Sequence, residues 1–171
     1  VGQTESSHLV EIRSRVEGFL DKRVYEEGSL VKAGQVLFRI DPRNFQATLQ
    51  QAKGELAQQE ARWATAKANL ARIKPLVEQN AVSKKDLDDA TGQEQATAAS
   101  VLAAQGKVRE AEINLSYTVI TSPVTGLSSQ AKKQDGTYIS ASDSLLTYVA
   151  KMNPMWVTFS LSENQYLNSL E

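Results

Sequence analysis

Apolar and polar residues follow two different periods along this chain, and each period predicts a different kind of element. Residues 8–16 alternate between polar and apolar side chains, which places Val10, Ile12 and Val16 on one face of a predicted strand. Between residues 45 and 115, apolar or small side chains recur instead at every third or fourth position, which is the heptad spacing of helices that pack on one another. The pattern therefore predicts two β segments with a long helical insertion between them.

The helical insertion contains two heptad seams with a break between them. The first seam has one polar member and consists of Phe45, Leu49, Ala52, Leu56, Gln59, Trp63, Ala66, Leu70, Ile73 and Val77. The second, weaker seam has two polar members and consists of Leu87, Ala90, Glu94, Thr97, Val101, Ala104, Val108, Ala111 and Leu115. Two seams joined by a short connector predict an antiparallel hairpin, with helices of roughly 30–36 residues and an arm of about 50 Å. We expect Trp63, as a seam residue, to pack between the helices rather than to recognise a ligand.

Local signals mark the connection between the two helices. Pro75 falls near the end of the first helix, where it is expected to kink or loosen the last turn. Asn80 is suited to a left-handed cap after that helix, and Ser83 followed by Asp86 is close to a capping box that starts the second helix. The tip of the hairpin is therefore expected near residues 76–83.

The two β segments that flank the helical insertion are similar to each other. Each contains Val-x-Gly, then an acidic residue followed by Gly, then an alternating apolar run. Three corresponding pairs are each separated by 108 positions: Gly18 and Gly126, Gly28 and Gly136, Leu37 and Leu145. An acidic residue followed by Gly is typical of a tight turn, because Gly adopts positive φ without steric cost. We interpret the segments as two halves of one β module that the hairpin splits.

A third domain is expected at the two ends of the chain. Asn153-Pro154 predicts a break before a strand at residues 155–161, and a lone strand leaves its backbone groups unpaired. Residues 1–8 and 152–171 are therefore interpreted as the edge of a further domain, and the chain as a piece of a longer protein.

Composition and charge exclude several classes of function. With 19 Lys and Arg residues against 20 Asp and Glu residues, the chain lacks the positive excess that attracts nucleic acid or an anionic membrane. It has no cysteine and no apolar run of about 18 residues, so any membrane anchor is expected to lie outside it. A single histidine, His8, and the absence of P-loop, dinucleotide and zinc motifs argue against an enzyme. We expect no catalytic residue, cofactor or metal site, because a turn explains Glu26-Glu27 and the helix dipole explains Asp88-Asp89.

The order of these features resembles the periplasmic adaptors, or membrane fusion proteins, of bacterial tripartite efflux pumps (the HlyD/RND adaptor family). The turns of both halves, the exit at residues 40–42 and the return at residues 114–118 and 122–126 are similar to the lipoyl domain of that family. The segment 153–157 resembles the entry to the family's β-barrel domain. The resemblance implies an elongated, multi-domain α+β chain. Its parts would be a partial β-barrel domain from 1–8 and 152–171, a lipoyl-like β module from 9–41 and 118–151, and a coiled-coil hairpin from 42–117.

The resemblance also implies a site at the hairpin tip. Adaptors of pumps driven by resistance-nodulation-division (RND) transporters carry an Arg, a Leu four residues later and a Ser seven beyond that, and Arg72, Leu76 and Ser83 stand at these intervals. These residues would contact the outer-membrane channel, since an apolar side chain flanked by a cation and a hydroxyl can enter a groove between helices. Leu76 lies off the seam, and Pro75 beside it departs from the usual pattern. The alternative is that Arg72 lies on a solvated face and Ser83 only caps a helix.

The implied function is that of a non-enzymatic adaptor linking an inner-membrane RND transporter to an outer-membrane TolC-type channel, for export of drugs or other toxic compounds. Several copies would associate into a ring, a trimer or a hexamer, in the periplasm of a Gram-negative bacterium. The ring would be attached to the inner membrane. Nucleic acid is not an expected partner.

Two other functions fit part of the pattern. An adaptor of a type I secretion system or an ATP-driven exporter is compatible with the same tip spacing. A lipoyl or biotinyl carrier subunit of an enzyme complex needs a lysine at the exposed turn between its two halves, whereas Lys22, which follows Asp21, lies inside the first half.

Overall fold

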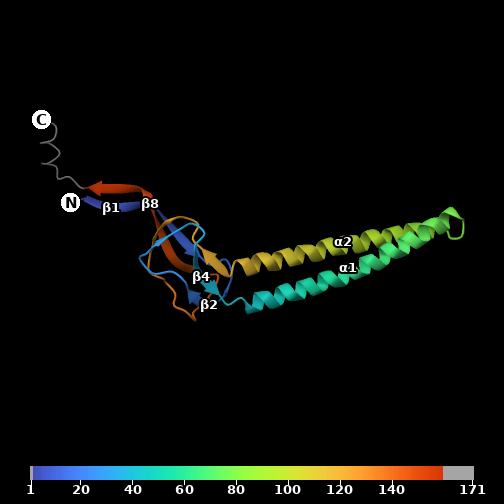
Figure 1. Cartoon of the computed structure of the whole chain (residues 1–171), viewed down its shortest axis with the longest axis horizontal. Coiled ribbons are helices and arrows are strands. Elements are labelled where there is room, and N and C mark those ends of the chain that lie inside the picture. The colour runs from blue at the N-terminus through green and yellow to red at the C-terminus, as the bar shows by residue number, and fades with distance from the viewer. Residues whose placement is uncertain (1, 160–171) are drawn as a thin grey trace, which may run out of the picture. The chain divides into compact units, whose positions relative to one another are not determined.

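The computed structural model describes the backbone of residues 2–159 and the side chains of residues 8–152. The chain divides into two compact units, the hairpin Pro42–Ser116 and a β unit formed by the segments on either side of it. The hairpin consists of α1 (Arg43–Glu78) and α2 (Lys84–Ser116) (Figure 1). The part of the expected third domain after residue 159 lies outside the described residues.

The β unit contains two antiparallel sheets of four strands each. The first half of the chain contributes β1 (Gly2–Arg13), β2 (Gly18–Arg23), β3 (Leu30–Val31) and β4 (Val36–Ile40). The second half contributes β5 (Val119–Thr121), β6 (Gly126–Ser128), β7 (Tyr138–Ile139) and β8 (Leu145–Phe159). The strand orders are β1-β8-β6-β3 and β5-β4-β2-β7. Each sheet thus takes two strands from each half, so neither half can complete a sheet without the other.

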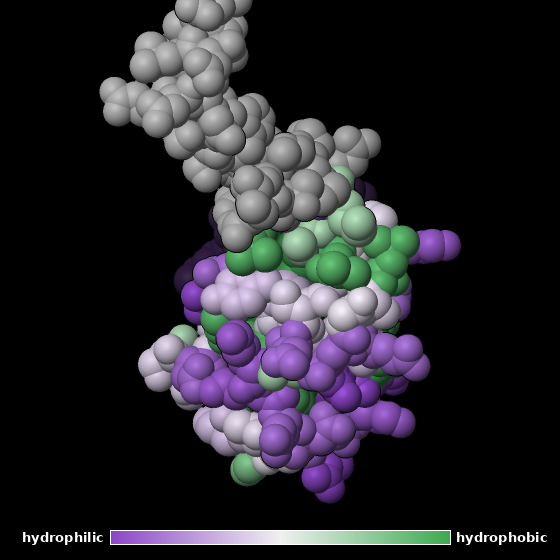
Figure 2. All heavy atoms as spheres, turned by 90° about the vertical axis from the view of Figure 1, so that its left-hand side faces the viewer, coloured by the Kyte–Doolittle hydropathy of each residue, from purple (hydrophilic) through white to green (hydrophobic). Residues whose placement is uncertain are grey.

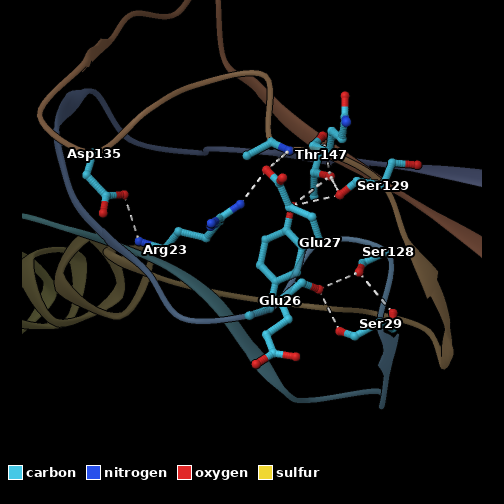
Figure 3. A network of polar contacts seen from close by, with 11 residues as sticks. Arg23, Glu26, Glu27, Ser29, Ser128, Ser129, Asp135 and Thr147 are labelled. Carbon is cyan, nitrogen blue, oxygen red and sulfur yellow. Dashed lines mark hydrogen bonds and ion pairs between the residues drawn. The ribbon is translucent and has the colours of Figure 1, made fainter.

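The two halves are joined by hydrogen bonds that repeat with the offset of 108 seen in the sequence. The backbone N–H of Arg23 donates to Asp135 Oδ1 at 2.9 Å, and the N–H of Ala131 donates to Glu27 Oε1 at 2.9 Å. In each bond the carboxylate of the acidic turn residue in one half accepts a backbone N–H from the other half. Glu27 also forms an ion pair with Arg23 (Figure 3). The hydrogen bond from Ala131 is the main reason that the pKa of Glu27 is lowered.

The core of the β unit lies between the two sheets. Its fully buried members come from both halves and include Leu20, Val31, Leu37, Phe38, Ile40, Ile139, Leu146 and Val149. The Tyr25 ring meets the Phe38 ring edge-on at 5.3 Å between centroids. Its hydroxyl lies 3.0 Å from the Ser129 carbonyl oxygen and 3.0 Å from Thr147 Oγ1, and burial raises the pKa of Tyr25. The first-half tyrosine therefore ties the core to two residues of the second half.

The strand at the start of the chain has the predicted face. Ile12 is buried and Val10 and Val16 are half-buried, although β1 itself ends at Arg13. The break expected at Asn153-Pro154 is wrong, because β8 runs through both residues to Phe159. The β1–β8 ladder instead shifts register there, between the pairs Ser6–Met155 and His8–Lys151. Proline cannot donate to a ladder but is tolerated at such a bulge, so the strand continues.

The outer face of the first sheet carries a row of apolar side chains. Cross-strand pairing places Leu9, Ala150, Leu127 and Leu30 side by side across all four strands. The three leucines are between 42% and 61% exposed. On the side of the chain shown in Figure 2, hydrophobic residues reach the surface in a band. The row of Leu9, Ala150, Leu127 and Leu30 is a group of adjacent apolar residues, whereas the single exposed apolar residues of an ordinary protein surface are scattered.

Both predicted heptad seams pack in the hairpin. The seam residues that are buried are Ala52, Ala66, Ala90, Val101, Ala104 and Ala111. Trp63 is half-buried, as expected for a seam residue, and its indole reaches α2. An ion pair between Glu55 and Lys107, at 2.9 Å, also joins the two helices. The antiparallel hairpin predicted from the seams is confirmed.

Candidate docking tip of the hairpin

The tip begins where α1 ends in a left-handed residue. Asn80 has a φ of 54°, which confirms the predicted cap. The N–H of Ala81 donates to the Leu76 carbonyl at 2.8 Å and the N–H of Asn80 donates to the Val77 carbonyl at 3.0 Å. These two bonds form a Schellman motif, which satisfies carbonyl groups that the end of a helix would otherwise leave unpaired. The backbone of Leu76 is therefore fixed by the turn that follows it.

The second helix begins with the predicted capping box. The Ser83 hydroxyl donates to Asp86 Oδ2 at 2.6 Å and accepts the backbone N–H of Asp86 at 3.2 Å. In return, the N–H of Ser83 donates to the same carboxylate at 3.0 Å. Hydrogen bonds from Ser83 lower the pKa of Asp86, so the box is intact at neutral pH. The turn between the helices is thus held by side-chain and backbone bonds at both ends.

Leu76 and Arg72 lie one helical turn apart on the same face of α1. Leu76 is 38% exposed, whereas its seam neighbours Ile73 and Val77 are half-buried. Arg72 is exposed, and its Nε donates to the Ala68 carbonyl at 3.4 Å. The α1 helix continues through Pro75 to Glu78, with the Pro75 carbonyl still accepting the N–H of Gln79 at 3.2 Å. Pro75 therefore does not end the helix before the turn.

The structure places the three predicted tip residues in two different settings. Arg72 and Leu76 are neighbours on α1, while Ser83 is exposed on the far side of the turn and starts α2. The Ser83 hydroxyl proton is already donated to Asp86, so toward a partner this hydroxyl can act only as an acceptor. The sequence predicted the left-handed cap at Asn80 but not the bond from Ala81 to Leu76, since Gly is the usual residue at that position and Asn the less common one.

The structure also bears on the other readings of the sequence. Lys22 lies within β2, opposite Arg39 of β4, and not at an exposed turn. Over the described part of the chain, neither helix is both long and apolar enough to cross a bilayer. Among the same residues, no three Asp, Glu or His side chains are grouped as a metal site would require.

Known proteins show a consistent similarity to this chain. The sequence profile described as "RND MFP, barrel-sandwich hybrid domain" matches residues 8–151. The multidrug resistance protein MdtA of Pantoea ananatis is 38% identical over 96% of this chain, and the membrane fusion protein MtrC of Neisseria gonorrhoeae is 39% identical over 97%. A crystal structure of a MacA-MexA chimera, which contains the α-hairpin domain of Pseudomonas aeruginosa MexA, matches 97% of this chain and 56% of the chimera. Its TM-score is 0.64 at 30% identity.

The chain spans 40% of the length of MdtA and 40% of the length of MtrC. The matched segment contains the whole hairpin and, on either side of it, most of both halves of the β unit. Together, the split β unit, the long helical hairpin and these similarities show that the chain belongs to the RND membrane fusion proteins.

Proposed function

We propose that this chain is part of a periplasmic adaptor that links an inner-membrane RND transporter to an outer-membrane TolC-type channel, for export of drugs or other toxic compounds. The observation that carries the proposal is the tip of the hairpin. Its turn is fixed by hydrogen bonds and exposes Leu76, in a chain that belongs to the RND membrane fusion proteins. The RND family match favours an RND transporter over a type I secretion or ATP-driven exporter. The position of Lys22 inside a strand disfavours a lipoyl or biotinyl carrier.

The tip residues Arg72, Leu76 and Ser83 are proposed to contact the channel. An exposed apolar side chain on a helix end can enter a groove between two helices of a partner, as a knob enters a hole. Arg72, one turn away on the same face, can pair with carboxylate or carbonyl groups at the rim of that groove. Ser83 supplies an acceptor for a donor on the partner and, through Asp86, fixes the start of α2.

Replacing Leu76 by aspartate is expected to weaken docking to the channel by at least about tenfold, because an interface would then desolvate an unpaired carboxylate. The measurement is the Kd of the full-length adaptor for purified candidate outer-membrane channels. Leu102→Asp is a matched control, since Leu102 is an exposed leucine of α2, 69% accessible, far along the helix from the turn. Equal binding by both variants and the parent, with a channel that does bind the parent, would remove the tip assignment.

Self-association into a ring, a trimer or a hexamer, is proposed to use the apolar row of Leu9, Leu30, Leu127 and Ala150. A row of this kind is more easily explained as a contact surface than as a solvated face. Each monomer would bury the row against a neighbouring copy. The partial β-barrel domain at residues 1–8 and 152–171 would dock the transporter.

Leu127→Asp is expected to lower the association constant of the adaptor by about tenfold or more, since it places a charge in the middle of this row. The measurement is the molar mass of the full-length protein across a concentration series. The control is again Leu102→Asp, which should leave the mass distribution of the parent unchanged. If Leu127→Asp associates as the parent does, the ring contacts lie elsewhere.

The proposed location is the periplasm of a Gram-negative bacterium, with attachment to the inner membrane by an anchor outside this chain. The adaptor role requires no catalysis, cofactor or metal. Its mechanism is positional: the β unit would form a collar with its neighbours, and the hairpin would present its tip to the channel.

A further inference from the structure

One level of the hairpin is polar, although the seams around it are apolar. Trp63 of α1 donates its indole N–H to Glu94 Oε1 of α2 at 2.7 Å. The helices are antiparallel, so a residue one turn before Trp63 in α1 lies near the level of a residue one turn after Glu94 in α2. Gln59 is therefore near the level of Thr97. The three polar members of the two seams, Gln59, Glu94 and Thr97, therefore lie within about one helical turn of the level of Trp63.

The rest of the interface specifies its register weakly. Five of the buried seam positions are alanines: Ala52, Ala66, Ala90, Ala104 and Ala111. A slip of one heptad along α2 would bring Ala111 or Thr97 to the level of Ala104, and Thr97 or Ser83 to the level of Ala90. These side chains are all small, so the packing at these levels would change little. Other contacts must therefore select the register. The β4–β5 pairs next to the helix ends, such as Arg39–Val119, set it at one end of the hairpin, and polar contacts between the helices can set it along their length.

The tryptophan and the glutamate oppose such a slip. A shift of one heptad would place Trp63 against Leu87 or Val101 and Glu94 against Leu56 or Leu70. The indole N–H would then lose its acceptor and the carboxylate would face an apolar side chain, and both changes are unfavourable. The polar level is thus compatible with the observed register and incompatible with its nearest alternatives.

Register determines which residues form the tip. A slip of one heptad is shared between the two helices, so the midpoint of the turn moves by about three or four residues along the chain. Asn80 would leave the left-handed position, and the bond from Ala81 to the Leu76 carbonyl would be lost. Leu76 would then no longer lie next to the turn.

We propose that the Trp63–Glu94 pair fixes the register of the hairpin and thereby selects the residues that form its tip. Trp63 and Glu94 are positioning residues, and they lie well away from the turn that they control. The consequence for the channel rests on the proposed function, whereas the register itself does not.

Crosslinking of introduced cysteines with a short bismaleimide tests the register directly, because the chain has no cysteine of its own. Glu55→Cys with Lys107→Cys reports the observed register, since these two long side chains reach each other in an ion pair at 2.9 Å, a span that a linker covers and a direct disulfide does not. Glu55→Cys with Ser100→Cys, or with Asn114→Cys, reports a slip of one heptad in either direction. These pairs also remove the Glu55–Lys107 ion pair, so they leave the register to the rest of the interface.

Trp63→Phe keeps an aromatic ring and removes the N–H, and it is expected to raise the ratio of slipped to native crosslink by about tenfold. Glu94→Gln keeps an acceptor oxygen and should retain the native crosslink. Glu94→Leu removes the acceptor while adding an apolar seam residue, so it should remain helical and yet slip. If Trp63→Phe loses its helical circular dichroism, its crosslinks no longer report the register. The crosslinks of Glu94→Leu then decide whether the pair fixes the register.

Native crosslinks only, in both Trp63→Phe and Glu94→Leu, would overturn the proposal. The crosslinks are read in the full-length adaptor without any channel present. A variant that slips but binds channels as the parent does would speak against the tip assignment alone, so the two failures are distinguishable.

Discussion

Gly126→Ala is expected to lower the free energy of unfolding of the β unit by about 3 kcal/mol, because the new methyl group has no space. A Cβ at Gly126 would lie 2.3 Å from the carbonyl oxygen of Ala150 and 2.8 Å from its carbonyl carbon. Both atoms belong to the backbone of β8, so no side-chain rotation can relieve the contact. The β6 strand would have to move away from β8, and the first sheet would lose the β6–β8 pairs at its middle.

The measurement for Gly126→Ala is denaturant unfolding of the full-length protein, with amide hydrogen exchange of β6 and β8 as the local readout. Gly106→Ala is the matched control, since a Cβ there meets nothing within 4 Å and the position is inside α2. It should stabilise the hairpin by about 0.5–1 kcal/mol, because glycine is a poor helix former. Equal and small effects at the two glycines would show that β6 does not approach β8 as described.

The features of the fold that could be predicted from the sequence are those set by neighbouring residues. The acidic-Gly pairs predicted tight turns, and Gly28 and Gly136 have φ values of 73° and 84°. Asn80 and the Ser83–Asp86 box were predicted for the same reason, since a cap is decided within about four residues. The offset of 108 predicted that the two halves are equivalent.

The pairing of the strands could not be predicted in this way. The strands β3 and β7 have two residues each, which is too short for any periodicity, and their partners β6 and β2 belong to the other half of the chain. Pairing between residues as far apart in the chain as Leu30 and Leu127, or Gly18 and Ile139, is decided by the shared core and not by local propensity. The same reasoning explains Pro154, since a proline that breaks an isolated strand is accommodated at a bulge when a long partner strand is present.

At the candidate site, too, the features set by neighbouring residues were predictable and those set by distant residues were not. The position of Leu76 off the seam predicted its exposure, while its proposed role came from a family resemblance and is not visible in composition or spacing alone. Glu94 was visible in the sequence as a polar seam residue, but its partner Trp63 is known only once the register of the helices is fixed. A polar residue in a seam is therefore a reason to search the opposite helix for its partner.

Phe38→Ala is expected to cost about 3–5 kcal/mol of the stability of the β unit, which is the range for removing a buried aromatic side chain. Phe38 is fully buried, and its strand pairs with Arg23 of β2 on one side and Ile120 of β5 on the other. Its removal would leave a cavity beside the Tyr25 ring, whose hydroxyl lies beside Ser129 and Thr147 of the other half. The loss would therefore spread from packing to the contacts that join the halves.

Phe19→Ala is the control for Phe38→Ala, because Phe19 is an aromatic residue of the same unit that is 58% exposed. It should cost less than about 1 kcal/mol, since most of its surface is already in contact with water. Hydrogen exchange of β4 and β8 should accelerate in Phe38→Ala, while the amides of α1 and α2 stay protected, because the hairpin has a packed interface of its own. A Phe38→Ala variant as stable as Phe19→Ala would show that the two sheets do not share one core. The joining of the two halves would then depend on the strand pairs between them and on the turn hydrogen bonds at Glu27 and Asp135.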